Sequence, residues 1–524
     1  MMKSFVLILL INFILSPNLF AQSDDELLDS LQHSAFRFFW YEANPSNGLI
    51  KDRNTSWSPS SIASVGFGLS AICVGVDRGW VAREAAKDRV LTTLKTFWQK
   101  PQGSAASGTI GYKGFFYHFL DMTTATRAWN SELSSIDTGL LLAGILDAQQ
   151  YFTGTDSIET LIRAYADSIY RRVDWNWMRN FSSGIMMEWK PETQFGTMGY
   201  WVGYNEAMIL YILALGSPTK PVPTTAWQAW TSGYTWETYY GYSYIPFPPL
   251  FGHQYSHCWV DFRNIRDAYM RWRGIDYFEN SRRATLAQRA YCIDNPGNFN
   301  GYSDSVWGLT ASDGPTGYAA RGAPPAFNDD GTITPTAALS SIPFTPEQSL
   351  AVAHKLYKTY RAQLWTNYGF RDAFNLKVNW WGPDVIGIDQ GPIIVMIENY
   401  RTQSVWNRFM NNPYIQVGLH RAGFEPVTDV NEPSVSISDF MLFQNYPNPF
   451  NPNTVIRYYI SRRGYISLKI FNLLGQEIAT LVDGIQDAGY KSVEWNAAKF
   501  PSGVYTYRLN TSEGVQTKRM LFIK

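Results

Sequence analysis

Cysteine and histidine are scarce in this sequence of 524 residues, which contains three Cys and six His. An odd number of cysteines allows one disulfide at most, and the spacing of Cys73, Cys258 and Cys292 matches no zinc motif, so we expect buried free thiols. His253 and His257 are four residues apart and could share one helix face, but a third metal ligand is not evident. We therefore expect no metal and no cofactor, and we expect these histidines to make hydrogen bonds in or near a pocket.

Net charge of either sign is also lacking, because 44 Lys and Arg balance 44 Asp and Glu. A neutral chain without basic tracts has no field to attract nucleic acid or an acidic membrane, so no nucleic-acid partner is expected. The chain has no P-loop, no Gly-x-Ser-x-Gly elbow and no His-Glu-x-x-His motif. These absences argue against nucleotide hydrolysis, the common serine hydrolases and zinc proteases.

Long apolar runs are missing except at the N-terminus, where Met1-Met2-Lys3 precedes the run Phe5–Leu15. That run is shorter than the ~20 residues a bilayer span takes. A basic start, an apolar centre and a small residue, Ala21, before a cut are typical of a cleavable export signal. We predict a signal peptide over residues 1–21 and no stable membrane span.

Aromatic residues are abundant, at 16% of the chain with 20 Trp and 32 Tyr. Such residues supply most of the area of a large core, but they can also stack on the flat apolar faces of sugar rings. Many of them lie in Pro- and Gly-rich stretches, so both interpretations stay open at this point.

Apolar residues recur three and four apart along most of the chain, which predicts helices. The expected helices are 26–42, 62–76, 81–98, 133–151, 161–173, 206–215, 259–278, 347–360 and 393–400. Long loops over 216–257 and 312–346 separate some of them, and long loops are usually functional. Successive helices whose loops gather at one end indicate a mainly α toroid around a central pocket.

The periodicity changes after Phe424. Residues 425–440 are polar with two prolines and read as a linker. From Met441 onward the apolar residues alternate, which predicts short strands at 454–460, 466–471, 492–495 and 504–509. We expect a small antiparallel β-sandwich over residues 441–524.

Four carboxylates lie beside helix starts and glycine turns, where a pocket would present them. Three of them also have a structural interpretation: Glu206 as a dipole partner in a first helical turn, Asp137 with Ser134 as a capping box, and Asp313 as part of an Asx-turn. Asp389 lies in a Gly-Ile-Asp-Gln-Gly-Pro turn just before a helix. Glycoside hydrolysis needs two such groups, one protonated acid and one base or nucleophile.

The C-terminal region carries the strings FQNYPNPFNPNT (443–454), LKIFNLLGQEIATLVDG (468–484) and FPSGVYTYRL (500–509). These resemble the type A sorting domain of the bacterial type IX secretion system. The resemblance implies secretion or surface display through the periplasm and outer membrane of a Gram-negative bacterium, with the secretion machinery as partner and the tail removed on the way. An ordinary carbohydrate-binding or fibronectin-like module is the alternative.

The large region carries SSIDTGLLLAG (134–144), GYNEAMILYILALGSP (203–218), FGHQYSHCWVDFR (251–263) and GIDQGPIIVMIENYR (387–401). With the N-terminal string LQHSAFRFFWYEANPSNGLIKDR, these resemble the glycoamylase-like domain, whose members include the endo-β-1,2-glucanases of glycoside hydrolase family 144. The resemblance implies an (α/α)6 barrel over residues 22–424. It also implies that Glu206 is the general acid and that Asp137, and more weakly Glu132, are acidic residues of the pocket.

The resulting expectation is an exported, monomeric glycoside hydrolase that cleaves a β-glucan, above all a β-1,2-linked glucan. It would act by an inverting acid/base mechanism. Glu206 would be the acid and Asp137 the base, or the residue that holds the acid in position. The residues expected to bind the oligo- or polysaccharide are Glu132, Trp201, Tyr204, His257, Trp259, Trp307, Asp313, Trp381, Asp389 and Gln390. A transglycosylase on the same glycans and a non-catalytic glycan-binding protein are the alternatives.

Overall fold

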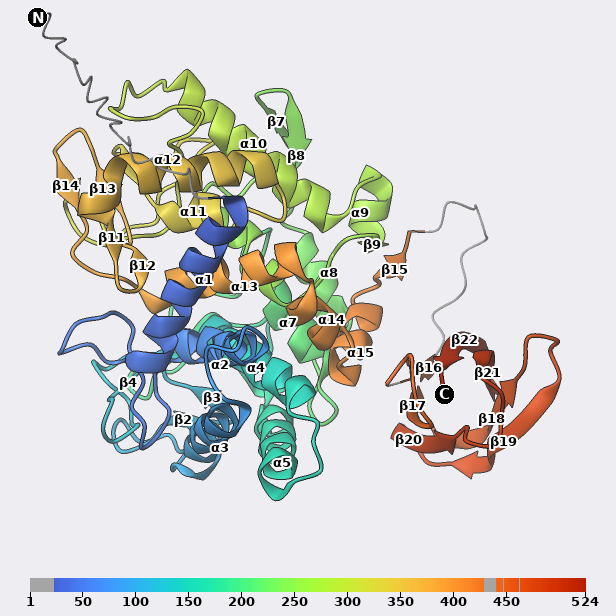
Figure 1. Ribbon diagram of the computed structural model, residues 1–524. Helices are drawn as coiled ribbons and strands as arrows, with labels where there is room; N and C mark the ends of the chain where they lie inside the picture. The colour runs from blue at the N-terminus through green and yellow to red at the C-terminus, as the bar shows by residue number, and fades with distance from the viewer. Residues whose placement is uncertain (1–22, 428–439, 446, 461) are drawn as a thin grey trace, which may run out of the picture.

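The computed structural model describes residues 23–427, 440–445, 447–460 and 462–524 (Figure 1). The expected signal peptide and most of the expected linker lie outside these ranges. Within them, no helix combines the length and the apolar run that crossing a bilayer takes.

An inner layer of helices is buried on nearly every side, and its members are apolar around their whole circumference, as the interior of a helical barrel requires. It consists of α2 (Ile62–Asp77), α4 (Ser135–Tyr151), α7 (Met208–Gly216), α11 (Pro335–Leu339) and α13 (Gly387–Arg401). Neighbours in the ring contact each other in the order α11, α13, α2, α4, α7.

Two short 3₁₀ helices, η1 (Leu250–His253) and η2 (Ser256–Cys258), link α7 to α11. The Ser256 hydroxyl accepts a hydrogen bond from the Ile209 N–H of α7 at 3.0 Å. Gln254 Nε2 donates to the Ala337 carbonyl of α11 at 2.7 Å. These contacts close the inner layer into a ring.

An outer layer of helices buries one face only. It includes α1 (Asp24–Tyr41), α3 (Arg83–Gln99), α5 (Ser157–Arg172), α10 (Tyr277–Asp294), α12 (Pro346–Leu364) and α15 (Pro413–Arg421). Shorter helices in the connections are α6 (Trp175–Met178), α8 (Thr225–Thr231), α9 (Ala268–Arg273) and α14 (Ser404–Met410). The two layers together form the helical barrel seen in Figure 1.

Short antiparallel strands brace the loops of the barrel. Their bounds are β1 (Ser60–Ser61), β2 (Gly111–Tyr112), β3 (Phe115–Phe116), β4 (Phe119–Leu120), β5 (Leu133–Ser134), β6 (Glu188–Trp189), β7 (Glu237–Tyr239), β8 (Tyr242–Tyr244), β9 (Ile265–Arg266), β10 (Thr332–Ile333), β11 (Trp365–Thr366), β12 (Gly369–Phe370), β13 (Phe374–Asn375), β14 (Trp380–Trp381) and β15 (Glu425–Pro426). The pairs β1–β4 and β5–β6 lie directly before α2 and α4, so they fix where these inner helices begin.

Most of the expected helices are present, with ends that differ by a few residues. The prediction of one helix over 259–278 is wrong, because this stretch contains β9, α9 and the start of α10. Asp267 and Asp276 each cap a new helix, and Gly274 ends α9 in the left-handed conformation. These caps and the glycine interrupt the apolar periodicity that predicted one continuous helix.

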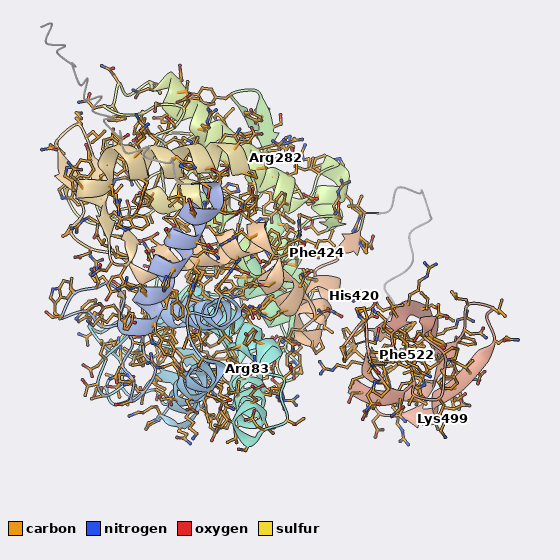
Figure 2. All side chains as sticks on the ribbon, viewed as in Figure 1. Arg83, Arg282, His420, Phe424, Lys499 and Phe522 are labelled. Carbon is orange, nitrogen blue, oxygen red and sulfur yellow. The ribbon has the colours of Figure 1, made fainter. Side chains whose placement is uncertain are left out.

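The first residues of the expected linker pair with the barrel. Glu425 and Pro426 form β15 against β9, and the Val427 N–H donates to the Asn264 carbonyl at 2.8 Å. Phe424, labelled in Figure 2, is buried against Trp227 and Tyr277. The barrel therefore extends to residue 427.

The C-terminal strands are β16 (Phe440–Leu442), β17 (Asn453–Ile460), β18 (Gly464–Phe471), β19 (Glu477–Gln486), β20 (Gly489–Asn496), β21 (Gly503–Thr511) and β22 (Gly514–Phe522). They form one sheet of order β16-β17-β20 and another of order β19-β18-β21-β22, with antiparallel pairing throughout. Side chains from both sheets, among them Ile456, Leu468, Trp495 and Tyr507, share one core.

Candidate active site

A cavity of about 280 Å³ opens where the inner helices begin. Its lining is Asp52, Arg53, Ser61, His118, Phe119, Ile136, Asp137, Leu140, Glu206, Phe251, Tyr255, Ala311, Tyr318, Ile386 and Ile388. These residues come from segments far apart in the sequence, as expected at the mouth of a helical toroid. Of the residues predicted to act in catalysis, both Glu206 and Asp137 line it.

Glu206 lies in the turn that leads into α7, and two neighbours fix this turn. The Ser256 hydroxyl donates to the Glu206 carbonyl at 3.0 Å. Asn205 Oδ1 accepts from the Ala207 N–H at 3.0 Å and from Trp230 Nε1 at 3.4 Å. The turn therefore holds the Glu206 side chain toward the cavity.

The Glu206 carboxyl group is poised to hold a proton near neutral pH. Its Oε2 is buried and has no hydrogen-bond partner in the part of the chain that the structure describes. Burial raises the pKa of Glu206 to about 7, and the negative charge of Asp137 acts in the same direction. A carboxyl group with such a pKa is suited to general acid catalysis.

Asp137 lies in the first turn of α4, and only 5% of it is exposed. The Ser134 hydroxyl caps this helix by accepting from the Asp137 N–H, and it also donates to Asp137 Oδ2. Asp137 therefore takes part in capping α4 and also lines the cavity.

His118 was not predicted from the sequence, yet it connects two of the predicted acids. Its Nδ1 lies 2.8 Å from Glu132 Oε1, and its Nε2 lies 3.7 Å from Asp137 Oδ1. Burial opposes a charge on His118, but the carboxylates of Asp137 and Glu132 outweigh that effect and raise its pKa to about 9. A cation at this position balances the two carboxylates.

A second acidic cluster surrounds Arg53, which lines the cavity together with Asp52. Arg53 Nη1 bonds Asp313 Oδ2 and Asp384 Oδ2, each at 3.0 Å, and Arg53 Nε lies 3.3 Å from Asp52 Oδ2. The Asp313 N–H donates to Asp372 Oδ2 at 2.6 Å. One guanidinium thus organises three carboxylates from three separate loops.

Asp389, in the first turn of α13, interacts with Asp372 in this cluster. Burial raises the pKa of Asp372 to about 7. Burial and the charge of Asp372 raise the pKa of Asp389 well above its usual value. Asp389 Oδ2 and Asp372 Oδ1 are both buried, and neither has a hydrogen-bond partner among the residues that the structure describes.

The other predicted binding residues divide between the vicinity of the cavity and the core. Trp201 Nε1 donates to Ser135 Oγ at 2.9 Å, in the first turn of the helix that also carries Asp137. The Gln390 amide donates to the Phe370 carbonyl at 3.2 Å and is buried. Trp381 is half-buried and stacks on Phe374 away from the lining residues.

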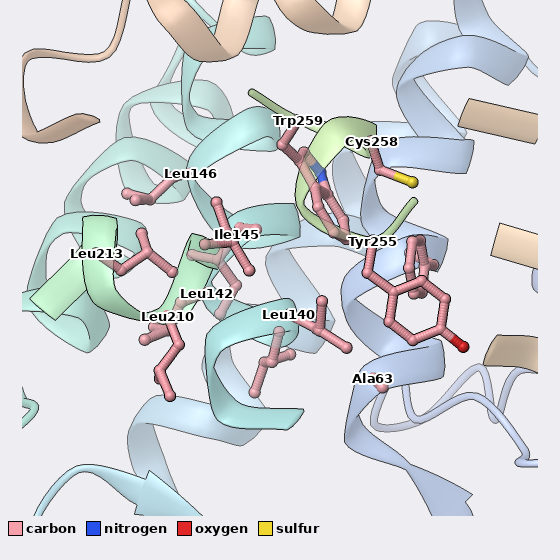
Figure 3. Close-up of a cluster of buried hydrophobic side chains, with 14 of the residues drawn as sticks. Ala63, Leu140, Leu142, Ile145, Leu146, Leu210, Leu213, Tyr255, Cys258 and Trp259 are labelled. Atoms are coloured by element: carbon pink, nitrogen blue, oxygen red, sulfur yellow. The ribbon is translucent and has the colours of Figure 1, made fainter. Parts of the chain in front are cut away.

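Trp259 and Trp307 are fully buried, so neither has an exposed face for a sugar. Trp259 stacks on Phe67 and donates to Ser70 Oγ at 2.9 Å, and Figure 3 places it among the apolar side chains between the inner helices. The expectation that these two rings stack on substrate is therefore corrected, because both serve the core.

Tyr204 and His257 are buried as well, and both bond Ser281. The Ser281 hydroxyl lies 3.3 Å from the Tyr204 hydroxyl and 3.0 Å from His257 Nε2. His253 lies 3.5 Å from the same hydroxyl through Nδ1. The two histidines therefore make hydrogen bonds as expected, but from two 3₁₀ helices and beside the cavity lining rather than in it.

The three cysteines, Cys73, Cys258 and Cys292, are free and buried, as predicted.

Sequence reasoning missed His118, Asp52, Arg53, Asp372 and Tyr318. Asp52 and Arg53 lie within the N-terminal string that resembles the family, so that string already contained a signal for them. His118 and Asp372 lie in loops without a motif, and tertiary structure alone brings them to the site.

Comparisons with known proteins identify the family of each region. A family model described as "Putative glucoamylase" matches residues 199–413, and a model of the secretion system C-terminal sorting domain matches residues 444–524. A curated exo-β-1,2-glucooligosaccharide sophorohydrolase (non-reducing end) from Parabacteroides distasonis is 34% identical over 78% of this chain and 59% of its own length. The chain thus spans about three-fifths of that relative.

Solved structures resemble the barrel over nearly their whole length. A "putative glucoamylase" from Bacteroides uniformis is 38% identical with a TM-score of 0.72, over 77% of this chain and 98% of its own. An endo-β-1,2-glucanase from Chitinophaga pinensis, in complex with sophorotriose and glucose, is 31% identical with a TM-score of 0.71, over 77% and 99%. The chain therefore belongs to the glycoamylase-like family and ends in a secretion system C-terminal sorting domain.

Proposed function

We propose that this protein is an exported glycoside hydrolase that cleaves β-1,2-linked glucan with Glu206 as the general acid. The observation that carries the proposal is the Glu206 carboxyl group, which lines the cavity with a pKa of about 7 and faces the charge of Asp137. The printed activities of the Parabacteroides and Chitinophaga relatives support the β-1,2 linkage.

In the proposed reaction, Glu206 donates its proton to the leaving glycosidic oxygen, directly or through a sugar hydroxyl, as the bond from that oxygen to the anomeric carbon breaks. A water molecule attacks the anomeric carbon from the opposite face and gives up a proton to a base, which inverts the configuration. Asp137 is either that base or the group that raises the pKa of Glu206. The proposed role of His118 is to balance the charge of Asp137 and Glu132.

Sugar hydroxyls would be held by the acidic cluster around Arg53. Asp389 and Asp372 each have a buried carboxylate oxygen for which the described residues provide no hydrogen-bond partner. Such atoms bind a hydroxyl strongly, since leaving them unsatisfied costs free energy. Trp201, which bonds Ser135 in the first turn of α4, would contribute an aromatic wall.

The proposed architecture is an (α/α)6 barrel in which the η1–η2 segment takes the sixth inner position between α7 and α11. The two C-terminal sheets with their shared core are proposed to form a β-sandwich that directs the protein through the periplasm and across the outer membrane. A signal peptide over residues 1–21 would start this route, and the exported enzyme is proposed to act as a monomer.

The experiment is incubation of the protein with linear β-1,2-, β-1,3-, β-1,4- and α-1,4-glucans, followed by sizing of the products. We expect shorter products from the β-1,2-glucan alone. Products longer than the substrate would identify a transglycosylase. Binding of a glucan without any change in its size would identify a glycan-binding protein and overturn the proposal.

A further inference from the structure

A row of aromatic rings continues from the cavity to the surface. His118 and Phe119 both line the cavity, and their rings stack with centroids 4.0 Å apart. The Phe119 ring lies 5.2 Å from Trp129, and Trp129 lies 6.3 Å from Trp57. The row therefore leads outward from the carboxylates of the site in three steps.

The two outermost rings are largely exposed, with 60% of Trp129 and 65% of Trp57 accessible. Because they are exposed, these two rings do not pack in the core, whereas Trp259 is fully buried there. An adjoining pair of exposed tryptophans that continues a cavity is typical of a binding surface.

The loop that carries Trp129 is held by the hydrogen bonds of one arginine. The buried Arg127 side chain donates to the carbonyls of Ser131 at 2.6 Å, Asn130 at 2.9 Å and Ala106 at 3.1 Å, and it forms two bonds to Glu192. Trp129 itself has φ of 54°. A bulky residue rarely adopts this left-handed conformation, and such outliers cluster at functional sites.

The loop that carries Trp57 is tied to the site as well. The Arg53 N–H donates to Ser58 Oγ at 3.1 Å, and the Arg53 guanidinium holds the acidic cluster. Asn54 exchanges two hydrogen bonds with Val385, close to the start of α13. Both tryptophans are therefore presented by loops that are anchored to the cavity wall.

We propose that Trp57 and Trp129 form a stacking platform for the part of the glucan chain that extends beyond the cavity. This inference rests on the proposed function and adds to it the surface that selects for chain length. The C–H groups of a sugar ring form a flat apolar face that packs on an exposed aromatic ring. The platform binds only those chains that are long enough to reach it, so it lowers KM for long substrates without touching the reacting bond.

The test compares Trp57→Ala, Trp129→Ala and the double variant with wild-type enzyme, on a long linear β-1,2-glucan and on the shortest β-1,2 oligosaccharide that the wild type cleaves. We expect kcat/KM on the long glucan to fall by about tenfold in the double variant, through KM, with little change on the short oligosaccharide. Trp129→Phe should restore most of the loss because it keeps a ring. Trp272→Ala is the matched control, since Trp272 is 70% exposed and contacts Tyr269 and Arg273 instead.

Two results would overturn the platform while leaving the hydrolase intact. One is unchanged kinetics on both substrates. The other is an equal loss on both substrates, which would mean that the rings act through Phe119 on the cavity. Direct titration of the long glucan into wild type and the double variant separates the two proposals. Tryptophan-dependent binding without hydrolysis would contradict the hydrolase and keep the platform, and absence of binding would contradict both.

Discussion

At the scale of single residues, the turn that carries Glu206 raises the pKa of its carboxyl group. The turn buries one carboxylate oxygen, which no described residue bonds, and Asp137 adds a negative charge nearby. Both effects disfavour the ionised form, so the pKa rises to about 7. A general acid must be protonated in the free enzyme, so we expect kcat/KM to fall as the pH rises through about 7.

The same burial makes Glu206 a source of pH-dependent instability. The native pKa lies above the ordinary value of 4.5, so the folded state binds the proton more tightly than the unfolded state between these values. The contribution of Glu206 to the free energy of unfolding is greatest below pH 4.5 and is lost as the pH rises through about 7. We expect Glu206→Gln to melt above wild type by about 2–4 °C at pH 8, with no difference at pH 4. Thermal unfolding at both values measures this, and a constant difference would contradict the assigned burial cost.

Asp137 influences Glu206 through its charge. In Asp137→Asn this charge is absent, so the pKa of Glu206 should fall and remain above 4.5 because burial persists. We expect the carboxyl titration of Glu206, followed by NMR, to move to lower pH by about half a unit to one unit. Asp304→Asn, in an exposed loop, is the control. An unchanged titration would show that Asp137 does not act on the acid.

At the scale of elements, the packing of the barrel depends on α2 and α4, whose backbones lie in direct contact at two glycines. A Cβ on Gly144 of α4 would lie 1.9 Å from the Gly66 carbonyl oxygen of α2, and a Cβ on Gly66 would lie 2.3 Å from the Leu140 carbonyl oxygen. Backbone atoms cannot rotate out of the way as a side chain does. The close approach of α2 and α4 is what brings Ser61 and Asp137 to one cavity.

We therefore expect Gly144→Ala to destabilise the protein by about 3 kcal/mol through overpacking, despite the better helix propensity of alanine. Gly139→Ala in the same helix is the control, because its Cβ would meet the end of the Leu210 side chain at 3.3 Å. Chemical denaturation of both variants measures the difference. Equal stability of the two variants would contradict the packing described here.

Helices with strong apolar periodicity could be predicted from the sequence, and those with competing signals could not. The helix at 62–76 matches α2 almost residue for residue, because a run this apolar has no place outside the core. By contrast α10 is rich in arginine and follows two aspartate caps and a glycine, so periodicity alone did not separate it from α9.

The candidate site shows the same division. Glu206 and Asp137 lie in recognisable strings at helix starts, and both line the cavity. His118 and the Asp372–Asp389 pair depend on contacts between distant loops, which no local pattern encodes. Trp259 and Trp307 were expected to bind sugar, but both are buried. The sequence alone does not show whether a tryptophan is buried in the core or exposed in a pocket.

At the scale of the whole molecule, the barrel contains the candidate chemistry and the C-terminal strands contain the sorting sequence. The two regions have separate cores. A protein that ends after Val427 should therefore keep the proposed glucanase activity in solution and fail to leave the cell envelope. Activity assays and cell fractionation measure the two properties, and loss of activity on removal of the tail would contradict this division.

The end of the barrel can be tested in the same series. A protein that ends after Phe424 lacks β15 and the Val427 bond to Asn264. We expect it to melt below the protein that ends after Val427, because the β9 edge then loses its pairing strand. Equal melting temperatures would place the end of the folded barrel at Phe424.

The central claim is that Glu206 protonates the leaving oxygen of a β-1,2-glucan. The most direct measurement is the rate at which wild type, Glu206→Gln and Glu347→Gln release reducing ends from linear β-1,2-glucan. Glu347 is exposed in the first turn of α12 and serves as the control. We predict that Glu206→Gln is slower by a factor of about 10²–10⁴, with Glu347→Gln unchanged. Full activity of Glu206→Gln would contradict the account.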